Sequence, residues 1–333
     1  MRWWHRLIAA AVAVALGTAI ASITYQVSVQ PGAAIVKAVF EAGPEVTPPK
    51  NFPSTAKTVT ETPDVPIRAH GVPASHIDIY RPKATTTALP VILWIHGGGF
   101  ISSSADTVRD YAIMLAHAGY LVASLDYSLA PGAQYPTPVI QGNAALGYLA
   151  QHAAQYGGDP SRIVLGGDSA GAQIAGQLAA VQTNPTLASS MHLIPALTHQ
   201  PLRAVVLFCG LYDLKTVANT GFPALRTYLW AYTGTRQWTT YPNIDQLSVV
   251  DQVTAHYPPT FLTVGDADPF HTQARELATT LRGKSVPLTT EFWNGTGDGL
   301  THEYQFNFTL PEANQAFTAT LHFLATHTQN GDQ

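Results

Sequence analysis

The chain has 333 residues, a formal net charge of −4, and a composition in which 46% of residues are hydrophobic and only 11% are charged. This composition supplies enough apolar side chains for a large core, which excludes a mostly disordered chain. The acidic balance and the lack of a basic cluster argue against nucleic acid as a partner.

The N-terminal segment, residues 1–25, is predicted to be a signal peptide or an N-terminal membrane anchor. Arg2 and Arg6 precede an uncharged apolar run, Leu7–Ile23. A basic region followed by an apolar run is typical of export signals. Cleavage after Ala21 would secrete the chain, whereas an uncleaved segment would anchor it to the outer face of the membrane.

Residues 26–72 are expected to have no domain of their own. Residues 32–43 have apolar side chains at helical spacing and predict a short amphipathic helix on the main domain. The Pro- and Thr-rich stretch that follows, about Thr47 to Pro73, predicts an extended strap.

Residues 73–328 alternate short apolar runs with longer amphipathic ones and predict one catalytic α/β domain. Strands are expected at 76–80, 91–95, 120–125, 162–166, 204–208, 260–264 and 288–292. Helices are expected at 108–119, 139–157, 170–182, 272–284 and 312–327. Apolar strands separated by helices indicate a mostly parallel sheet covered on both faces, with ligands bound at the carboxyl ends of its strands.

A G-x-S-x-G motif, Gly167–Gly171, lies between a predicted strand and a predicted helix. In that context the sharp turn exposes the hydroxyl of Ser169 at the helix N-terminus, and small neighbours are needed to fit the turn. The alternative is a serine N-cap among packing glycines, since the motif alone also arises by chance.

The stretch VILWIHGGGF, Val91–Phe100, ends a predicted strand in consecutive glycines. Glycines here leave backbone N–H groups free to approach a developing oxyanion, so Gly98 and Gly99 are candidate donors, with Ala170 as a third. The Gly-Lys-Ser/Thr of a phosphate-binding loop is missing.

A serine nucleophile requires a base and a carboxylate that orients it, in the chain order Ser, Asp or Glu, His on this fold. His302 lies in a glycine-rich loop after the last predicted strand. Asp266 and Asp268 compete as the orienting acid, with Asp298 as a third and weaker candidate.

HGGGF, DYSLAPGAQYP, GDSAG, GDADPF and the late loop histidine together resemble the hormone-sensitive-lipase-like group of α/β-hydrolase esterases. The resemblance spans about residues 70 to 327. It implies the α/β-hydrolase fold and no cofactor. It also implies the following roles: Ser169 as nucleophile, His302 as base, Asp268 rather than Asp266 as the acid, and Gly98, Gly99 and Ala170 as the oxyanion hole.

The chain departs from this group at three positions. Ser128 and Gly132 replace the arginine and glutamate of the usual Tyr-Arg-Leu-Ala-Pro-Glu, so a local ion pair is expected to be missing. Thr301 precedes the histidine where glycine is common. His271 follows the Asp-Pro turn and ranks below His302, because it is too close in sequence to Asp268.

A cap insertion is predicted at about 210–258, because this connection is too long for a simple loop and is rich in aromatic residues. The cap would cover a pocket for a short- to medium-chain or aryl ester. The chain has none of the usual zinc motifs, and Cys209, its single cysteine, is expected to be a buried small hydrophobe.

The sequence therefore predicts a serine carboxylester hydrolase that acts on a small-molecule ester, contacts the membrane only through its N-terminal segment, and uses no metal. An amidase, peptidase or lactonase on the same triad remains an alternative, because the oxyanion machinery is shared. A non-catalytic surface binding protein on a hydrolase scaffold is the remaining alternative, and the intact motifs argue against it.

Overall fold

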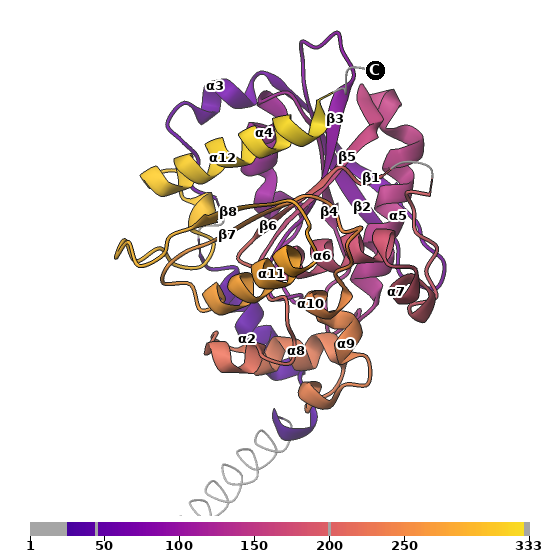
Figure 1. Cartoon of the computed structure of the whole chain (residues 1–333), viewed down its shortest axis with the longest axis vertical. Coiled ribbons are helices and arrows are strands. Elements are labelled where there is room, and N and C mark those ends of the chain that lie inside the picture. Colours follow the sequence, from indigo (N-terminus) through magenta and orange to yellow (C-terminus); the bar gives the residue numbers. More distant parts are fainter. Residues whose placement is uncertain (1–24, 44–45, 199–200, 330–333) are drawn as a thin grey trace, which may run out of the picture.

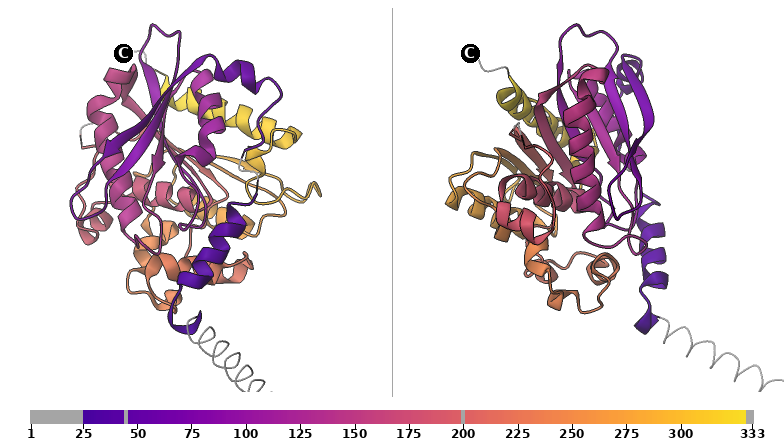
Figure 2. Two further views of the ribbon diagram at one scale, coloured as in Figure 1. Left: turned by 180° about the vertical axis from the view of Figure 1, so that it is seen from behind. Right: turned by 90° about the vertical axis from the view of Figure 1, so that its right-hand side faces the viewer.

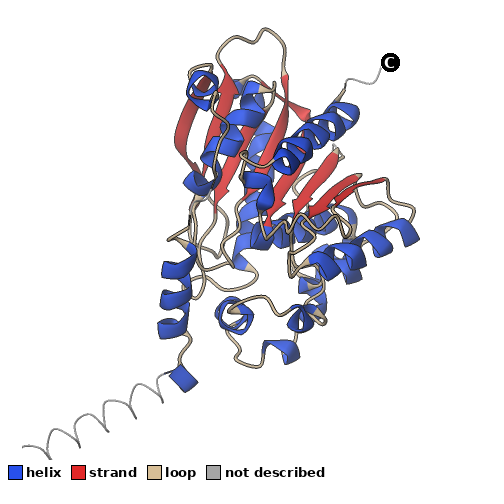
Figure 3. Ribbon diagram, turned by 90° about the vertical axis from the view of Figure 1, so that its left-hand side faces the viewer, coloured by secondary structure: helices blue, strands red, loops and turns tan. Residues whose placement is uncertain are grey.

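The fold is a twisted eight-stranded sheet with helices on both faces (Figures 1 and 3). The computed structural model describes residues 25–43, 46–198 and 201–329. The strands are β1 (Val59–Ile67), β2 (Ser75–Pro82), β3 (Leu89–Ile95), β4 (Leu121–Asp126), β5 (Gly158–Asp168), β6 (Ala204–Phe208), β7 (Thr260–Val264) and β8 (Leu288–Phe292).

The longer helices are α2 (Gln30–Phe40), α4 (Arg109–His117), α5 (Thr137–His152), α6 (Ser169–Thr183), α8 (Leu225–Thr233), α11 (His271–Gly283) and α12 (Pro311–Thr328). Shorter ones are α3 (Phe52–Ala56), α7 (Pro185–Ser190), α9 (Ile244–Leu247) and α10 (Val249–Gln252). Short 3₁₀ turns are η1 (Ala105–Val108), η2 (Ala153–Tyr156), η3 (Val217–Thr220), η4 (Trp238–Thr240) and η5 (Tyr304–Phe306).

The strand order is β1-β2-β4-β3-β5-β6-β7-β8. The pairs β1–β2 and β2–β4 are antiparallel, and all pairs from β4 onward across the sheet are parallel. The predicted α/β fold and its seven strands are confirmed. Because β3 and β5 to β8 run the same way, their carboxyl ends meet at one edge, where ligands bind in such sheets.

Alternating side chains of the central strand β3 explain how both faces are covered. Trp94 packs against Tyr111 of α4, and Tyr111 in turn meets Phe317 of α12 with ring centroids 5.6 Å apart. The next residue, Ile95, faces α5 and α6. The helix pair α4 and α12 therefore covers one face, and α5 and α6 cover the other, as strand periodicity requires.

The segment predicted to be an extended strap is not a free linker, because much of it forms α3 and the edge strand β1. The prolines Pro63 and Pro66 argued against a strand, but an edge strand tolerates proline because one side of it needs no ladder hydrogen bonds. Val59, Val65 and Ile67 are buried, which fixes its register on β2. A bulge between Thr62 and Val65 absorbs the intervening residues.

Residues 210–258 contain η3, α8, η4, α9 and α10, and they lie beyond the carboxyl edge of the parallel strands (Figures 1 and 2). The N-terminal helix α2 packs against α8, where Gly32 lies so close to Thr227 that a Cβ would stand 3.2 Å from its methyl group. Two segments about 190 residues apart in sequence thus form one layer over the sheet edge.

The predicted export or anchor segment, residues 1–25, lies outside the described residues except for Tyr25. Within the described part of the chain, we find no helix with the length and apolar character needed to cross a bilayer.

Gly171 should be intolerant of any side chain. A Cβ at this position would stand 2.0 Å from the carbonyl oxygen of Ile95 and 2.4 Å from that of His96, and both are backbone atoms that cannot move aside. We expect Gly171→Ala to lower the free energy of unfolding by about 3 kcal/mol or more. Denaturant unfolding would measure this loss.

Gly147→Ala is the matched control in another helix, because a Cβ there meets only Ala196 at an ordinary 3.7 Å. This substitution should stabilise the chain by about 0.5–1 kcal/mol through helix propensity. Equal effects of the two substitutions would contradict the close approach of α6 to β3.

Candidate active site

Ser169 is the first residue of α6 and directly follows β5. Its φ of +50° places it in the left-handed region, which a residue with a Cβ adopts at a cost. The neighbouring Gly167 and Gly171 make this turn possible, since a Cβ on either would overlap backbone atoms. The sharp turn holds the serine hydroxyl at the carboxyl end of the strand.

His302 joins Ser169 to Asp268. The Nε2 of His302 lies 2.8 Å from Ser169 Oγ, and its Nδ1 lies 2.9 Å from Asp268 Oδ2. The other carboxylate oxygen, Oδ1, accepts a hydrogen bond from the backbone N–H of Phe270 at 2.7 Å, which fixes the carboxylate in the turn before α11. Residues that follow three different strands, β5, β7 and β8, thus form one continuous hydrogen-bonded chain.

The other candidate acids do not reach His302. Asp266 accepts hydrogen bonds from the backbone N–H groups of Leu300 at 2.7 Å and Gly297 at 3.2 Å. These N–H groups, Leu300 first, lower the pKa of Asp266. Its role is therefore to hold the glycine-rich loop before His302, while Asp298 is exposed in that same loop.

His271, the weaker candidate base, has a hydrogen-bond partner on its own helix. Its Nε2 accepts a hydrogen bond from Arg275 Nε, one turn along α11, at 3.1 Å.

The glycine loop lies opposite Ser169. Gly98 and Gly99 have φ of +88° and +60°, and a Cβ on Gly98 would stand 2.4 Å from the Ser102 carbonyl oxygen. The Tyr127 hydroxyl donates to the carbonyl oxygen of Gly97 at 3.0 Å, and the Tyr127 ring stacks on His96. Tyr127 therefore holds the glycine loop. It lies beside Ser128, which replaces the arginine of the family's usual motif.

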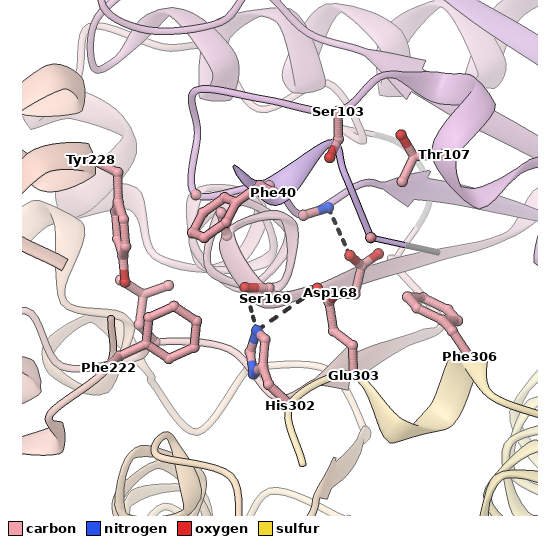
Figure 4. A pocket seen from close by; sticks show the side chains of 16 residues that line it. Phe40, Ser103, Thr107, Asp168, Ser169, Phe222, Tyr228, His302, Glu303 and Phe306 are labelled. Carbon is pink, nitrogen blue, oxygen red and sulfur yellow. Dashed lines mark hydrogen bonds and ion pairs between the residues drawn. The ribbon is translucent and has the colours of Figure 1, made fainter. Parts of the chain in front are cut away.

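A cavity of about 150 Å³ opens above these groups (Figure 4). Backbone and side chains of Gly98, Gly99, Ser169, Ala170 and His302 line it. Aromatic walls come from elements far apart in sequence: Phe40 of α2, Phe222 and Tyr228 of the 210–258 segment, and Phe306 of η5.

The aromatic residues also fix the ring of His302. Phe222 meets it edge-on with centroids 4.8 Å apart, and Phe270 does so at 5.4 Å. The side chain of His302 is 20% exposed, so only its edge toward the cavity is open.

The titration of His302 reflects its neighbours. Burial lowers the pKa of its imidazole, but the Asp268 carboxylate beside Nδ1 outweighs burial and holds that pKa above its ordinary value. Cys209 itself is buried at the end of β6, and burial raises the pKa of its thiol to about 12. The thiol is therefore protonated at neutral pH and is a packing group, not a nucleophile.

Two further carboxyl groups in the cavity wall, those of Asp168 and Glu303, were not predicted from the sequence. Asp168 is the variable residue of the G-x-S-x-G motif, and it accepts hydrogen bonds from Trp94 Nε1 at 2.8 Å and the Gly97 N–H at 2.7 Å. Glu303 directly follows His302 and has a φ of +58°. That adjacency was the one signal in the sequence that could have revealed Glu303.

Two clusters of described residues have the spacing to share a metal ion: Cys209, Asp268 and His302, and separately Asp64, His76 and Asp78. In the first cluster both nitrogens of His302 are already hydrogen-bonded to Asp268 and Ser169. A metal there would have to displace this hydrogen-bonded chain.

A comparison with known protein families identifies the family of the chain. The model of the BD-FAE family matches residues 77–281, which is more than half of the chain. The chain belongs to the BD-FAE family.

Relatives of this BD-FAE protein include an acetyl esterase of Salmonella schwarzengrund, 28% identical over 263 residues that cover 73% of this chain and 75% of the relative. Esterase B of Lactobacillus rhamnosus has a similar structure, with a TM-score of 0.77, 22% identity, and coverage of 90% and 94% of the two chains. A bacterial heroin esterase aligns with a TM-score of 0.69 and 25% identity, covering 83% of this chain and 86% of its own. The chain is an α/β-hydrolase of the hormone-sensitive-lipase-like esterase group and a carboxylic ester hydrolase.

The pKa of His302 should depend on Asp268. Because the Asp268 carboxylate stabilises the imidazolium, we expect His302 to titrate above the ordinary value of about 6.5. Replacement Asp268→Asn removes the negative charge and should lower this pKa. Titration of the His302 ring signals by NMR in the two proteins measures it, and an equal pKa in both would contradict the pairing.

Proposed function

We propose that the chain is a serine esterase in which Ser169, His302 and Asp268 form the catalytic triad and Gly98, Gly99 and Ala170 form the oxyanion hole. The observation that carries this proposal is the hydrogen-bonded chain from Asp268 through His302 to Ser169, which ends in a cavity facing the glycine loop.

The mechanism follows from these positions. His302 Nε2 accepts the Ser169 proton as Oγ attacks the ester carbonyl carbon. Asp268 holds the tautomer with a proton on Nδ1 and stabilises the imidazolium that forms. Backbone N–H groups of Gly98, Gly99 and Ala170 stabilise the negative oxygen of the tetrahedral intermediate.

The imidazolium then gives its proton to the leaving alcohol, and the acyl group remains on Ser169. Water enters, loses a proton to His302, and attacks the acyl-enzyme by the same route, which returns Ser169 as a free hydroxyl. No step requires a cofactor.

The cavity supports a small substrate. A volume of about 150 Å³ is the size of a cavity that holds benzene. This space suits acetyl to butyryl groups or one aromatic ring, and a longer acyl chain would have to displace α2 or the 210–258 segment. We therefore infer short-chain or aryl esters of small alcohols as substrates.

An ester rather than an amide is the favoured bond. The relatives named above are esterases. Amide or lactone hydrolysis on the same triad is the second candidate, because each of these reactions passes through the same oxyanion.

We further propose that residues 1–25 direct the chain out of the cytoplasm, either as a cleaved signal or as an anchor. The support is the sequence pattern of Arg2 and Arg6 before an uncharged apolar run. The catalytic domain would then act on extracytoplasmic esters.

Ser169→Ala should abolish hydrolysis of chromogenic esters from acetate to laurate. We expect a loss of at least about 10³-fold in kcat with the fold retained. For the wild-type protein, the highest kcat/KM should fall at acetate to butyrate. A Ser169→Ala protein that keeps most of its activity would refute the nucleophile, and an optimum at laurate would refute the size of the acyl site.

Asp268→Asn and its neighbour Asp266→Asn form a matched pair. The first removes the partner of His302 Nδ1 and should lower kcat by about 10⁴-fold, as loss of the orienting acid does in serine hydrolases. The second removes only hydrogen bonds to the glycine-rich loop and should lower kcat far less. Steady-state kinetics on one short-chain ester decides between them, and the reverse order would assign the acid to Asp266.

A further inference from the structure

The active-site cavity has two chemically different sides (Figure 4). Phe40, Phe222 and Tyr228 form an aromatic side. On the other side of Ser169, the cavity is lined by Glu303 together with Asp168. The catalytic roles proposed above make no use of either carboxyl group.

Glu303 is directed into the cavity by its backbone. Its left-handed conformation, φ +58°, turns the side chain back past His302, and Glu303 Oε1 lies 3.8 Å from His302 Nε2. A Cβ placed on Gly97 would stand 2.8 Å from this oxygen and 2.5 Å from Asp168 Oδ2. The glycine at position 97 is therefore what allows both carboxyl groups to lie here.

The two carboxyl groups lie close together and differ in exposure. Asp168 is buried, and burial first and then the neighbouring Glu303 carboxylate raise the pKa of Asp168 well above its ordinary value. Two negative charges this close repel each other, so a charge is favoured on the more exposed member of the pair. That member is Glu303, whose side chain is 33% exposed.

Apart from His302, no cationic side chain among the described residues of the cavity wall lies beside the Glu303 carboxylate. The residues that line the cavity include no lysine or arginine, and all of them belong to the described part of the chain. His302 Nε2 lies 3.8 Å from Glu303 Oε1 and pairs with it when protonated. In the form that accepts the Ser169 proton, however, His302 is neutral, and the Glu303 carboxylate then has no cationic partner in the cavity wall. A substrate group can therefore supply the missing positive charge.

We propose that the Glu303 side of the cavity binds the alcohol part of the ester and selects alcohols that carry a protonated amine. The inference rests on the proposed function, since it assumes that His302 protonates the leaving alcohol. Glu303 is the residue that determines this specificity.

The geometry determines how far the amine can be from the alcohol oxygen of the substrate. The alcohol oxygen must approach His302 Nε2 to receive its proton, and Glu303 Oε1 lies 3.8 Å from that nitrogen. An ammonium group two carbons from the alcohol oxygen can reach the carboxylate, and it would make a charge-assisted hydrogen bond there. An alcohol that carries a carboxylate would instead be repelled.

A purely positional role for Glu303 is the alternative. Through Asp168 and the Gly97 N–H, Glu303 is linked to the glycine loop, so its loss could slow hydrolysis of every ester alike. A change in the ratio between a charged and a neutral substrate separates the two roles, since a positional role leaves that ratio unchanged.

The test compares two esters of equal shape, 2-(dimethylamino)ethyl acetate and 3-methylbutyl acetate, at pH 7, where the amine is protonated. We expect the wild-type protein to favour the amine ester in kcat/KM. Glu303→Gln should reduce this preference roughly tenfold, the effect of losing one charge-assisted hydrogen bond. Glu303→Asp keeps the charge and should keep the preference.

Asp298→Asn is the control, because it removes one exposed acid from the loop before His302 without altering the cavity wall. It should leave the ratio unchanged. An equal ratio in wild-type and Glu303→Gln, or a wild-type preference for the neutral ester, would overturn the inference.

The test of the amine preference can fail while the test of the serine esterase activity succeeds, so the two results are distinguishable. Hydrolysis of 3-methylbutyl acetate that is lost in Ser169→Ala supports the serine esterase whatever the ratio shows. Titrations of wild-type protein with 2-(dimethylamino)ethanol and 3-methylbutan-1-ol, followed by NMR, test the inference with no variant and no turnover. Binding of the amine roughly tenfold tighter supports it, and equal binding refutes it.

Discussion

The close approach of the N-terminus of α6 to the end of β3 is the constraint on which the site depends. At Gly171 the helix backbone lies directly against the carbonyl groups of Ile95 and His96, with no room for a methyl group. The residues just before Gly171 include Ser169, and those just after His96 are the three glycines. One packing contact between two backbones therefore brings together the serine hydroxyl and the N–H groups that face it.

Three acidic side chains from different loops lie near Ser169, and their surroundings give them different roles. Asp268 is fixed by the Phe270 N–H and points at His302. Asp168 is buried, and its oxygens accept hydrogen bonds from Trp94 Nε1 and the Gly97 N–H. Glu303 is partly exposed to the cavity. Three carboxyl groups near one serine can therefore orient a base, hold a loop and face the substrate without interfering with one another.

The sequence predicted the fold well because its signals are periodic and local. Seven apolar runs separated by helical patterns identify a parallel sheet. Strand β1 was missed because its prolines, such as Pro63, and its exposed polar side chains resemble a linker, and only pairing with β2 gives it a buried face. That pairing is a tertiary property and leaves no local pattern.

For the site, motif and chain order placed Ser169, Asp268 and His302 among the candidates, because strand ends determine which loops meet. Glu303 was not predicted, since the direction of its side chain depends on a left-handed backbone at that position. The contribution of Phe40 to the cavity wall was not predicted either. Its helix was predicted, but which residue of that helix would reach the cavity depends on how α2 packs against α8.

The position of Phe40 limits how far the catalytic centre can be from Gln30, the first residue of α2. Helix α2 begins at Gln30 and ends at Phe40, which lines the cavity. At about 1.5 Å per residue, 11 helical residues span only about 16 Å. If the preceding segment stays in a bilayer, the opening of the cavity is tethered within a few nanometres of the lipid surface, and esters concentrated at that surface lie within its reach.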